Sequence, residues 1–251
     1  MAKALLGQPD CITAWRNAAG MVGSERGREA YDVLIEVLEP TSGASLSDPG
    51  VALVDKILTK RAKPLASVAN TIFPQALYER HGYPNLFEAF DQIVPRVSKN
   101  ERWSGYYFER MTRHHNVIGE RLNPLREIIE RMKDPEVKSR MKFELPIFDL
   151  DRDVNLSPYG GQCLSHISFK LAGHSGSRVN LTCLYRNHYY IEKLLGNLIG
   201  LGRLQAFVAS ETNREIGTLT VLSTHAVIDK PGSLKHSDID SLLEDVERNT
   251  T

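Results

Sequence analysis

Four residues between positions 160 and 227 carry side chains that could bind and attack a phosphorylated heterocycle. Cys163 follows a pair of glycines and supplies a thiol, while Arg186 supplies a guanidinium group. Asn197 adds a carboxamide and His225 an imidazole. A cysteine attacks as its thiolate, which a nearby cation favours. Arginine binds phosphate through paired hydrogen bonds, and a carboxamide both donates and accepts. Together these residue types predict covalent chemistry on a nucleotide-like ligand.

Each residue also has an ordinary structural interpretation. A buried cysteine usually packs as a small hydrophobic side chain, and we interpret Cys183, inside an apolar strand pattern, in that way. Cys11 is expected near a mobile terminus and receives no role. Taken alone, Arg186 is typical of a surface arginine, Asn197 of an amide bonded to neighbouring backbone, and His225 of a buried core histidine. Both interpretations therefore stay open for single residues.

The composition is that of an ordinary globular protein. The chain has 251 residues, of which 41% are hydrophobic and 25% charged, and its formal net charge is zero. The lack of a basic excess argues against a nucleic-acid-binding role. No apolar run is long enough to span a bilayer, so we expect no membrane association. Three cysteines without framework spacing fit a cytoplasmic protein, and no Cys/His cluster has the spacing of a metal site.

Hydrophobic periodicity predicts helices first and strands mostly later. A helical period marks residues 12–24, 64–73, 123–132 and 191–210. Apolar runs rich in β-forming residues predict strands at 31–38, 141–148, 162–171, 178–184 and 216–228. Residues 51–58 fit either a helix or a strand, and 75–100 a mixture of helix and loop.

This order of elements is typical of an α+β fold. We expect one domain over residues 1–251, because no linker is long enough to divide the chain. Residues 230–251 are polar, and we expect them to form a peripheral helix or a frayed tail.

The order and spacing of the chemistry-bearing residues resemble the thymidylate synthase family, with its pyrimidine-nucleotide hydroxymethylase relatives. In that family a catalytic cysteine on a strand precedes a hairpin, an arginine segment, an asparagine eleven residues later, and an Asp-x-His segment. Here Arg186 and Asn197 are eleven positions apart. The helical residues 200–204 look like those that follow the family's asparagine, and residues 223–225 (Ser-Thr-His) look like its Asp-x-His segment.

Weaker similarity extends toward the N-terminus. Residues 134–140, which end in Arg140, look like the family's motif for phosphate arginines donated across the dimer. Tyr107 begins a segment similar to a Tyr-Gly-x-Arg motif of some members, and Arg26 lies where an N-terminal phosphate loop would be. Residues 67–71 look like the helix that carries the family's catalytic glutamate, whose position is Thr71 here.

The resemblance implies a thymidylate synthase-like three-layer fold whose mixed sheets pack back to back in a homodimer. It implies a transferase that adds a thiol to C6 of a pyrimidine nucleoside monophosphate such as dUMP. A methyl or hydroxymethyl group from 5,10-methylenetetrahydrofolate would then pass to C5. The implied catalytic residues are Cys163, Tyr107 and His225. The implied substrate-binding residues are Arg26, Arg140, Arg186, Asn187, Asn197 and His225, with Asn197 favouring uracil and Arg186 lowering the thiol pKa.

The chain also departs from the family pattern. Thr71 replaces the glutamate, Tyr189 replaces an aspartate that binds the pterin, and Ser223 replaces the aspartate of Asp-x-His. Gln162 precedes the nucleophile instead of proline, and the apolar C-terminal segment that closes over folate has no counterpart. The alternative hypothesis is therefore a catalytically degenerate nucleotide-binding or scaffold protein with the same fold.

Overall fold

The computed structural model describes residues 2–97, 105–116, 118–154 and 161–250; Gly160, the first glycine before Cys163, lies outside the described residues. The strands are β1 (Lys3–Gln8), β2 (Glu29–Val37), β3 (His114–His115), β4 (Arg121–Leu122), β5 (Phe143–Pro146), β6 (Leu164–Ala172), β7 (Arg178–Tyr185), β8 (His188–Tyr189) and β9 (Glu215–Val227).

Among the residues described, eight helices lie in the first 160 residues and two longer ones lie near the C-terminus. They are α1 (Cys11–Gly23), α2 (Pro49–Arg61), α3 (Leu65–Ile72), α4 (Gln75–His81), α5 (Asn85–Val97), α6 (Tyr107–Thr112), α7 (Pro124–Lys133), the single turn α8 (Leu150–Asp153), α9 (Leu194–Glu211) and α10 (His236–Thr250). Three short 3₁₀ turns are η1 (Arg26–Arg28), η2 (His174–Gly176) and η3 (Pro231–Ser233).

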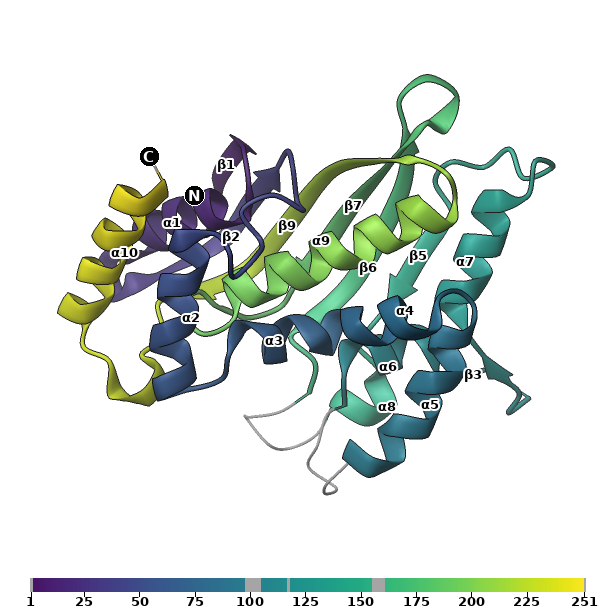
Figure 1. Ribbon diagram of the computed structural model, residues 1–251, viewed down its shortest axis with the longest axis horizontal. Helices are drawn as coiled ribbons and strands as arrows, with labels where there is room; N and C mark the ends of the chain where they lie inside the picture. Colours follow the sequence, from purple (N-terminus) through teal and green to yellow (C-terminus); the bar gives the residue numbers. More distant parts are fainter. Residues whose placement is uncertain (1, 98–104, 117, 155–160, 251) are drawn as a thin grey trace.

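One mixed sheet organises the chain, in the order β1-β2-β9-β7-β6-β5 with β8 paired to β9 (Figure 1). The pairs β1–β2, β7–β9 and β8–β9 are parallel, whereas β2–β9, β5–β6 and β6–β7 are antiparallel. Parallel pairing of β7 with β9 requires a crossover, which α9 provides. The mixed α+β character predicted from the sequence is confirmed, and η2 connects the antiparallel strands β6 and β7 as a hairpin.

Helices cover one face of this sheet in two tiers. Helix α9 packs on β7 and β9, and α1 packs on β1 and β2. Helix α3 lies outside α9, and α2 and α10 lie against each other (Figure 1). On the face turned toward α9 and α1 the strands place side chains such as Val33, Leu181 and Val221, which are fully buried. Burying each contributes roughly 1.5–3 kcal/mol, so this face forms the core.

Two glycines set the distance between α9 and α3. A Cβ at Gly196 would lie 2.7 Å from Val68 Cβ, and one at Gly200 would lie 2.8 Å from the backbone oxygen of Ala69. Such contacts are too short for real side chains, so the glycines allow the helix axes to approach closely. Gly196 and Gly200 therefore serve the packing of the two helices.

Most predicted elements are present, and two alternatives that the sequence left open are decided. Residues 51–58 belong to a helix, α2, and residues 230–251 contain a regular helix, α10, whose Ile239, Leu242 and Val246 are buried. Cys11 is not at a mobile terminus: it is fully buried at the start of α1, and its Sγ donates to the Pro40 carbonyl at 3.3 Å. The cause is β1, a strand that the sequence reading did not predict and that ties the N-terminus to β2.

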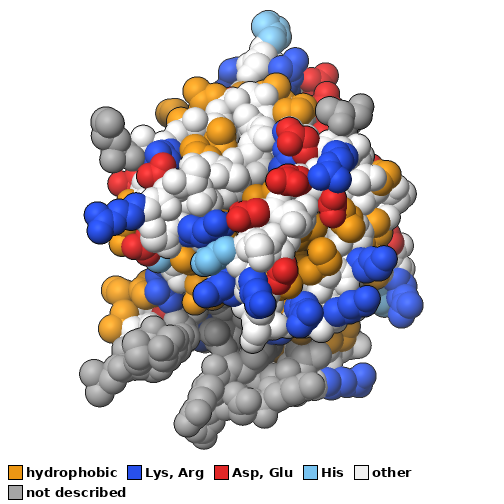
Figure 2. Space-filling model, turned by 90° about the vertical axis from the view of Figure 1, so that its left-hand side faces the viewer, with side chains coloured by type: hydrophobic (Ala, Val, Ile, Leu, Met, Phe, Trp, Pro, Cys, Tyr) orange, Lys and Arg blue, Asp and Glu red, His pale blue; other side chains and the backbone are white. Residues whose placement is uncertain are grey.

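The outer surface around α10 and α2 carries acidic and basic side chains side by side (Figure 2). Among the described helices, none is long and apolar enough to cross a bilayer.

Candidate functional site

A pocket of about 560 Å³ opens beside Cys163. One part of its lining comes from the α2–α3 connection, from α3 and from the start of α6. The other part comes from the segment before β6, from β8 and the residues next to it, and from the start of α9. The described lining residues are Lys63, Ser67, Val68, Thr71, Gly105, Tyr106, Tyr107, Gly161, Gln162, Cys163, Asn187, His188, Tyr189, Lys193 and Asn197. They include two lysines and no carboxylate, which favours an anionic ligand.

Cys163 lies directly before β6 and is half-buried. Its carbonyl accepts a hydrogen bond from the Arg186 backbone N–H at 2.9 Å, which joins the ends of β6 and β7. Burial raises the pKa of the Cys163 thiol, and the charges of Arg186 and Lys193 act in the opposite direction. Burial is the larger effect, so the expected lowering of the thiol pKa by Arg186 is present but outweighed.

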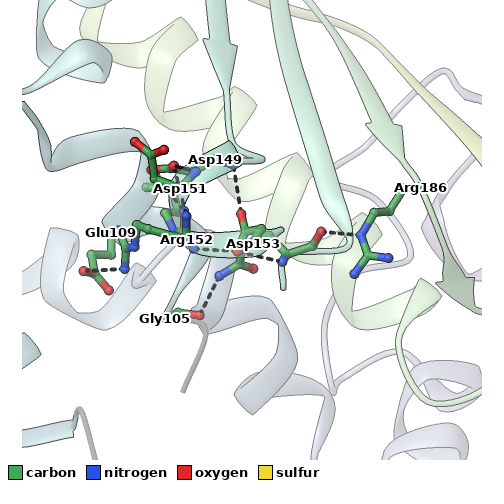
Figure 3. A network of polar contacts seen from close by, with 9 residues as sticks. Gly105, Glu109, Asp149, Asp151, Arg152, Asp153 and Arg186 are labelled. Atoms are coloured by element: carbon green, nitrogen blue, oxygen red, sulfur yellow. Dashed lines mark hydrogen bonds and ion pairs between the residues drawn. The ribbon is translucent and has the colours of Figure 1, made fainter. Parts of the chain in front are cut away.

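The Arg186 side chain is anchored to the segment that precedes the nucleophile (Figure 3). Its Nε donates to the Gln162 carbonyl at 2.9 Å, and its guanidinium lies 5.9 Å from the centre of the Phe148 ring. A Cβ at Gly161 would lie 3.5 Å from Arg186 Nη2 and 3.2 Å from the Asp153 backbone oxygen. Gly161 also has a φ of +69°, so both its backbone and its surroundings require glycine.

A buried ion pair contacts the segment that precedes Cys163. Arg110 Nη2 lies 2.8 Å from Asp153 Oδ1, and the exposed fractions of the two side chains are 4% and 0%. The Gln162 backbone N–H donates to the same Asp153 oxygen at 3.3 Å, and Gln162 Nε2 donates to the Gly105 carbonyl at 3.0 Å. Figure 3 shows the resulting chain of contacts from α6 and α8 to Arg186. The position of Cys163 thus depends on charges in two distant segments.

Tyr107, expected to be catalytic, begins α6 and lines the pocket. Burial, the largest effect, raises the pKa of its phenol, and backbone groups of Leu164 and Cys163 act in the opposite direction. The structure therefore brings Tyr107 and Cys163 together. In the same segment Arg110 forms the buried ion pair with Asp153, so one short helix contributes to both features.

Asn197 is almost fully buried in the first turn of α9 and faces the pocket. Its Nδ2 lies 2.9 Å from His188 Nε2. His188 Nδ1 lies 3.0 Å from Ser223 Oγ, which also accepts from the Tyr190 hydroxyl at 3.3 Å. Burial lowers the pKa of His188 to about 3, so the ring is neutral at physiological pH. The ring stacks on Tyr185 with centroids 4.0 Å apart.

His225 lies next to this site rather than in it. Its Nδ1 is 2.8 Å from Asn187 Oδ1, and its Nε2 is 3.2 Å from Glu29 Oε2. Asn187 lines the pocket, so His225 orients a pocket residue and does not itself appear in the lining. Arg26, expected to bind phosphate, is exposed on η1, three positions before Glu29.

Arg140 does not approach Cys163 within this chain. Its carbonyl accepts from the Leu171 N–H, at the hairpin end of β6, while Cys163 lies before the other end. A strand of that length spans roughly 25–30 Å. The phosphate role expected of Arg140 would therefore require a second copy of the chain, as the resemblance implies.

The helical wall of the pocket contains Thr71, at the position expected for the catalytic glutamate. Its hydroxyl donates to the Val68 carbonyl at 2.7 Å, a bond within its own helix. Tyr189, at the position expected for a pterin-binding aspartate, lines the opposite side and is 41% exposed.

Sequence reasoning missed several residues that the structure places in or under the pocket. Lys63 and Lys193 line it, and His188 is the partner of Asn197. Arg110 and Asp153 support the cysteine segment. The sequence offered a weak signal for His188, because it lies within the Tyr-Arg-Asn-His run that also holds Arg186. It offered none for the lysines, which look like ordinary surface charges.

Comparisons with known proteins give one distant relative with a name. The chain is 26% identical over 139 residues to a Methanosarcina mazei protein described as "Putative thymidylate synthase", covering 55% of this chain and 60% of that protein. The match thus spans less than two thirds of the relative's length. No family model matches the chain. The similarity suggests a thymidylate synthase-like relationship, in agreement with the resemblance noted from the residues.

Proposed function

We propose that the pocket binds a pyrimidine nucleoside monophosphate and that Cys163 adds to C6 of its base. The observation that carries this proposal is that Cys163 and Asn197, which are 34 positions apart, line one pocket whose described lining holds two lysines and no carboxylate. A thiol, a base-reading amide and cationic side chains are what this reaction requires. The distant relative's name supports the same class of transferase.

The chemistry begins with a bond between Cys163 Sγ and C6. The electron pair of the C5–C6 double bond moves toward C5 and O4, which makes C5 nucleophilic. An electrophile then bonds to C5, the C5 hydrogen leaves as a proton, and the Sγ–C6 bond breaks to restore the double bond. A one-carbon donor at the formaldehyde oxidation level would yield a hydroxymethyl group, whereas a methyl product also needs a hydride.

Phosphate binding falls to the cations near the nucleophile. Lys63 and Lys193 line the pocket, and the Arg186 guanidinium borders it at Gly161. Asn187, held by His225, adds a carboxamide to the same side. We propose that Arg26 and a partner copy's Arg140 complete the phosphate site, which would make the protein a homodimer. The sheet face away from α9 supports this, because His166, Thr182 and Leu222 remain half-exposed or exposed there.

The pocket does not fit 5,10-methylenetetrahydrofolate in the way the resemblance implies. Its described lining has no carboxylate for a proton relay or a pterin, since Thr71 and Tyr189 occupy the expected positions. Helix α10 packs against α1 and α2, and no α10 residue is among the described lining. The described lining therefore does not indicate which one-carbon donor the pocket would use.

These same features favour a second candidate function. A thiol with a raised pKa beside Thr71 is poorly prepared for turnover, so the chain could bind the nucleotide without transforming it. In this alternative the fold, the base-reading amide and the phosphate cations serve a regulatory or scaffold protein. The two functions differ in whether a covalent bond to C6 forms.

Release of tritium from the C5 position of [5-³H]dUMP, measured without folate, tests the proposal. Reversible addition of Cys163 exchanges the C5 hydrogen with water, so we expect release by the unmodified chain and a loss of at least about 10³-fold in Cys163→Ser. Cys183→Ser is the matched control, because Cys183 is buried in β7 and away from the pocket. Intact-mass measurement with 5-fluoro-dUMP would detect the adduct directly.

The alternatives give distinct outcomes. Binding of dUMP without exchange or adduct would support the non-catalytic function and reject the transferase. Unchanged nucleotide affinity in Arg186→Ala would reject the phosphate role of Arg186. Parallel measurements with UMP would show which sugar the pocket accepts.

A further inference from the structure

His188 is the one residue that bonds the base-reading amide from behind, among the contacts of the described residues. It is 2% exposed and lies in β8, with its ring fixed between Tyr185 and Tyr190. The ring centroids of His188 and Tyr185 are 4.0 Å apart with nearly parallel planes, and those of His188 and Tyr190 are 5.5 Å apart at 89°. The imidazole therefore has little freedom to rotate, and its two nitrogens have fixed neighbours.

Those neighbours determine which nitrogen carries the proton. A neutral imidazole has one donor and one acceptor nitrogen. Asn197 Nδ2 can only donate, so Nε2, 2.9 Å away, is the acceptor. The proton is then on Nδ1 and is donated to Ser223 Oγ at 3.0 Å. Ser223 uses its second lone pair for the Tyr190 hydroxyl. The chain Tyr190–Ser223–His188–Asn197 is thus internally consistent with one tautomer.

We propose that His188 acts as a positioning residue that fixes the carboxamide of Asn197 for a 4-oxo-pyrimidine and against a 4-amino-pyrimidine. The inference rests on the proposed function, since it assumes that the base lies on Asn197. With one N–H held by His188, the amide keeps its oxygen and its second N–H for the pocket. The oxygen accepts from N3–H of uracil, and the N–H donates to O4.

Cytosine presents the opposite pattern, with an acceptor at N3 and a donor at N4. Reading it would require the amide to turn by half a rotation, which sets the Asn197 oxygen against the lone pair of His188 Nε2. The contact becomes favourable only if the proton moves from Nδ1 to Nε2. Ser223 would then have to donate to Nδ1 instead of accepting from it. The buried chain of hydroxyls and the imidazole must rearrange together, so discrimination depends on His188 and Ser223 as well as on Asn197.

The ratio of affinities for dUMP and dCMP tests this proposal. The unmodified chain should prefer dUMP by about 10- to 100-fold, the range expected from one mismatched buried polar group. His188→Phe keeps a flat ring against Tyr185 but removes both nitrogens, so Asn197 can turn freely. We expect its ratio to fall to within about threefold of unity, mostly through stronger binding of dCMP. His174→Phe, the same substitution in the exposed η2 turn, should leave the ratio unchanged.

Ser223→Ala offers a second test that leaves the pocket lining intact and removes the acceptor for Nδ1. It should lower the ratio in the same direction even if His188→Phe fails to fold. A ratio unchanged in both His188→Phe and Ser223→Ala would overturn the role of His188. If His188 had a purely structural role, its substitution would weaken the binding of both nucleotides equally. That result would also overturn the proposed positioning role.

Asn197→Asp separates failure of this inference from failure of the proposed function. A carboxylate only accepts, so it matches one of the two edge groups of either base, and the variant should lose the preference for dUMP over dCMP. If Asn197→Asp changes the ratio while His188→Phe does not, the base lies on Asn197 and His188 is not involved. If the unmodified chain binds neither nucleotide, the proposed function itself is wrong.

Discussion

The two walls of the pocket differ in how their polar groups are held. On one side, formed by the ends of β6, β7 and β8 and the start of α9 and here called the strand wall, Cys163, Asn187 and Asn197 each contact a polar partner: Arg186, His225 and His188 respectively. On the helical side, Ser67 and Thr71 come from α3, and the Thr71 hydroxyl bonds to its own helix. Partners fix the orientation of side chains before a ligand arrives, which lowers the cost of binding.

This difference separates binding from turnover. The strand wall contains what a pyrimidine nucleotide needs: a thiol, a fixed amide and nearby cations. The described residues of the helical wall include no carboxylate that would move protons to and from a base at neutral pH. In the proposed function, the groups that hold and attack the base therefore come from one wall, and a proton-transfer group would have to come from the other.

The largest effect is expected from breaking the support of the strand wall. Asp153→Asn removes the nearer anionic partner of the buried Arg110 guanidinium, at 2.8 Å, and leaves only Asp149 at 3.6 Å, which should lower the free energy of unfolding by up to about 3–5 kcal/mol. Urea denaturation measures this loss, and labelling of Cys163 by iodoacetamide reports the loosened segment. Asp151→Asn, an exposed neighbour in α8, should change stability by less than about 0.5 kcal/mol. Equal losses in the two variants would contradict the role of the ion pair.

A substitution on the helical wall is expected to increase the rate of hydrogen exchange at C5. Thr71→Glu places a carboxylate in the pocket, where it can exchange protons with the base. We expect tritium release from [5-³H]dUMP to rise about tenfold, below the usual range for an acid–base residue because its surroundings are not adapted to it. Ser67→Glu, on the same helix, is the matched control. No gain in Thr71→Glu would mean that proton transfer does not limit the exchange.

The sequence predicted the strand wall better than the helical wall, and the reason is local patterning. The hairpin β6–β7 and the helix α9 follow from apolar periodicity and turn residues within about fifty positions, which also place Cys163 and Asn197. The strand β1 was missed because its apolar run is short and interrupted by Gly7. Its pairing with β2 is parallel and depends on tertiary context.

The supporting residues could not be predicted for a similar reason. Arg110 and Asp153 are 43 positions apart, and residues 149–153 contain three aspartates with nothing to indicate which becomes buried. His188 was visible only as part of a motif, since its partners Ser223 and Asn197 come from β9 and α9. Burial decides which polar residues matter here, and burial is a property of the assembled fold.

The smallest effect concerns the charge beside the thiol. Burial holds the Cys163 thiol pKa above its ordinary value, while Arg186 and Lys193 lower it. Alkylation of Cys163 should therefore accelerate with rising pH until the thiol is fully ionised. Lys193→Met removes one cation, which raises the pKa further and moves the curve to higher pH. Below the pKa, alkylation should slow by about two- to fivefold, the effect of one partly exposed charge.

The two curves should meet at high pH, where both thiols are fully ionised, which distinguishes an electrostatic effect from a blocked approach. Lys63→Met is the matched control, because Lys63 lines the pocket but is not among the charges acting on Cys163. Mass mapping after alkylation assigns the reaction to Cys163, since Cys11 and Cys183 are buried. An unchanged curve would mean that Glu192, 2.5 Å from Lys193 Nζ, already neutralises that charge at the thiol. Arg186 alone would then supply the cation of the strand wall.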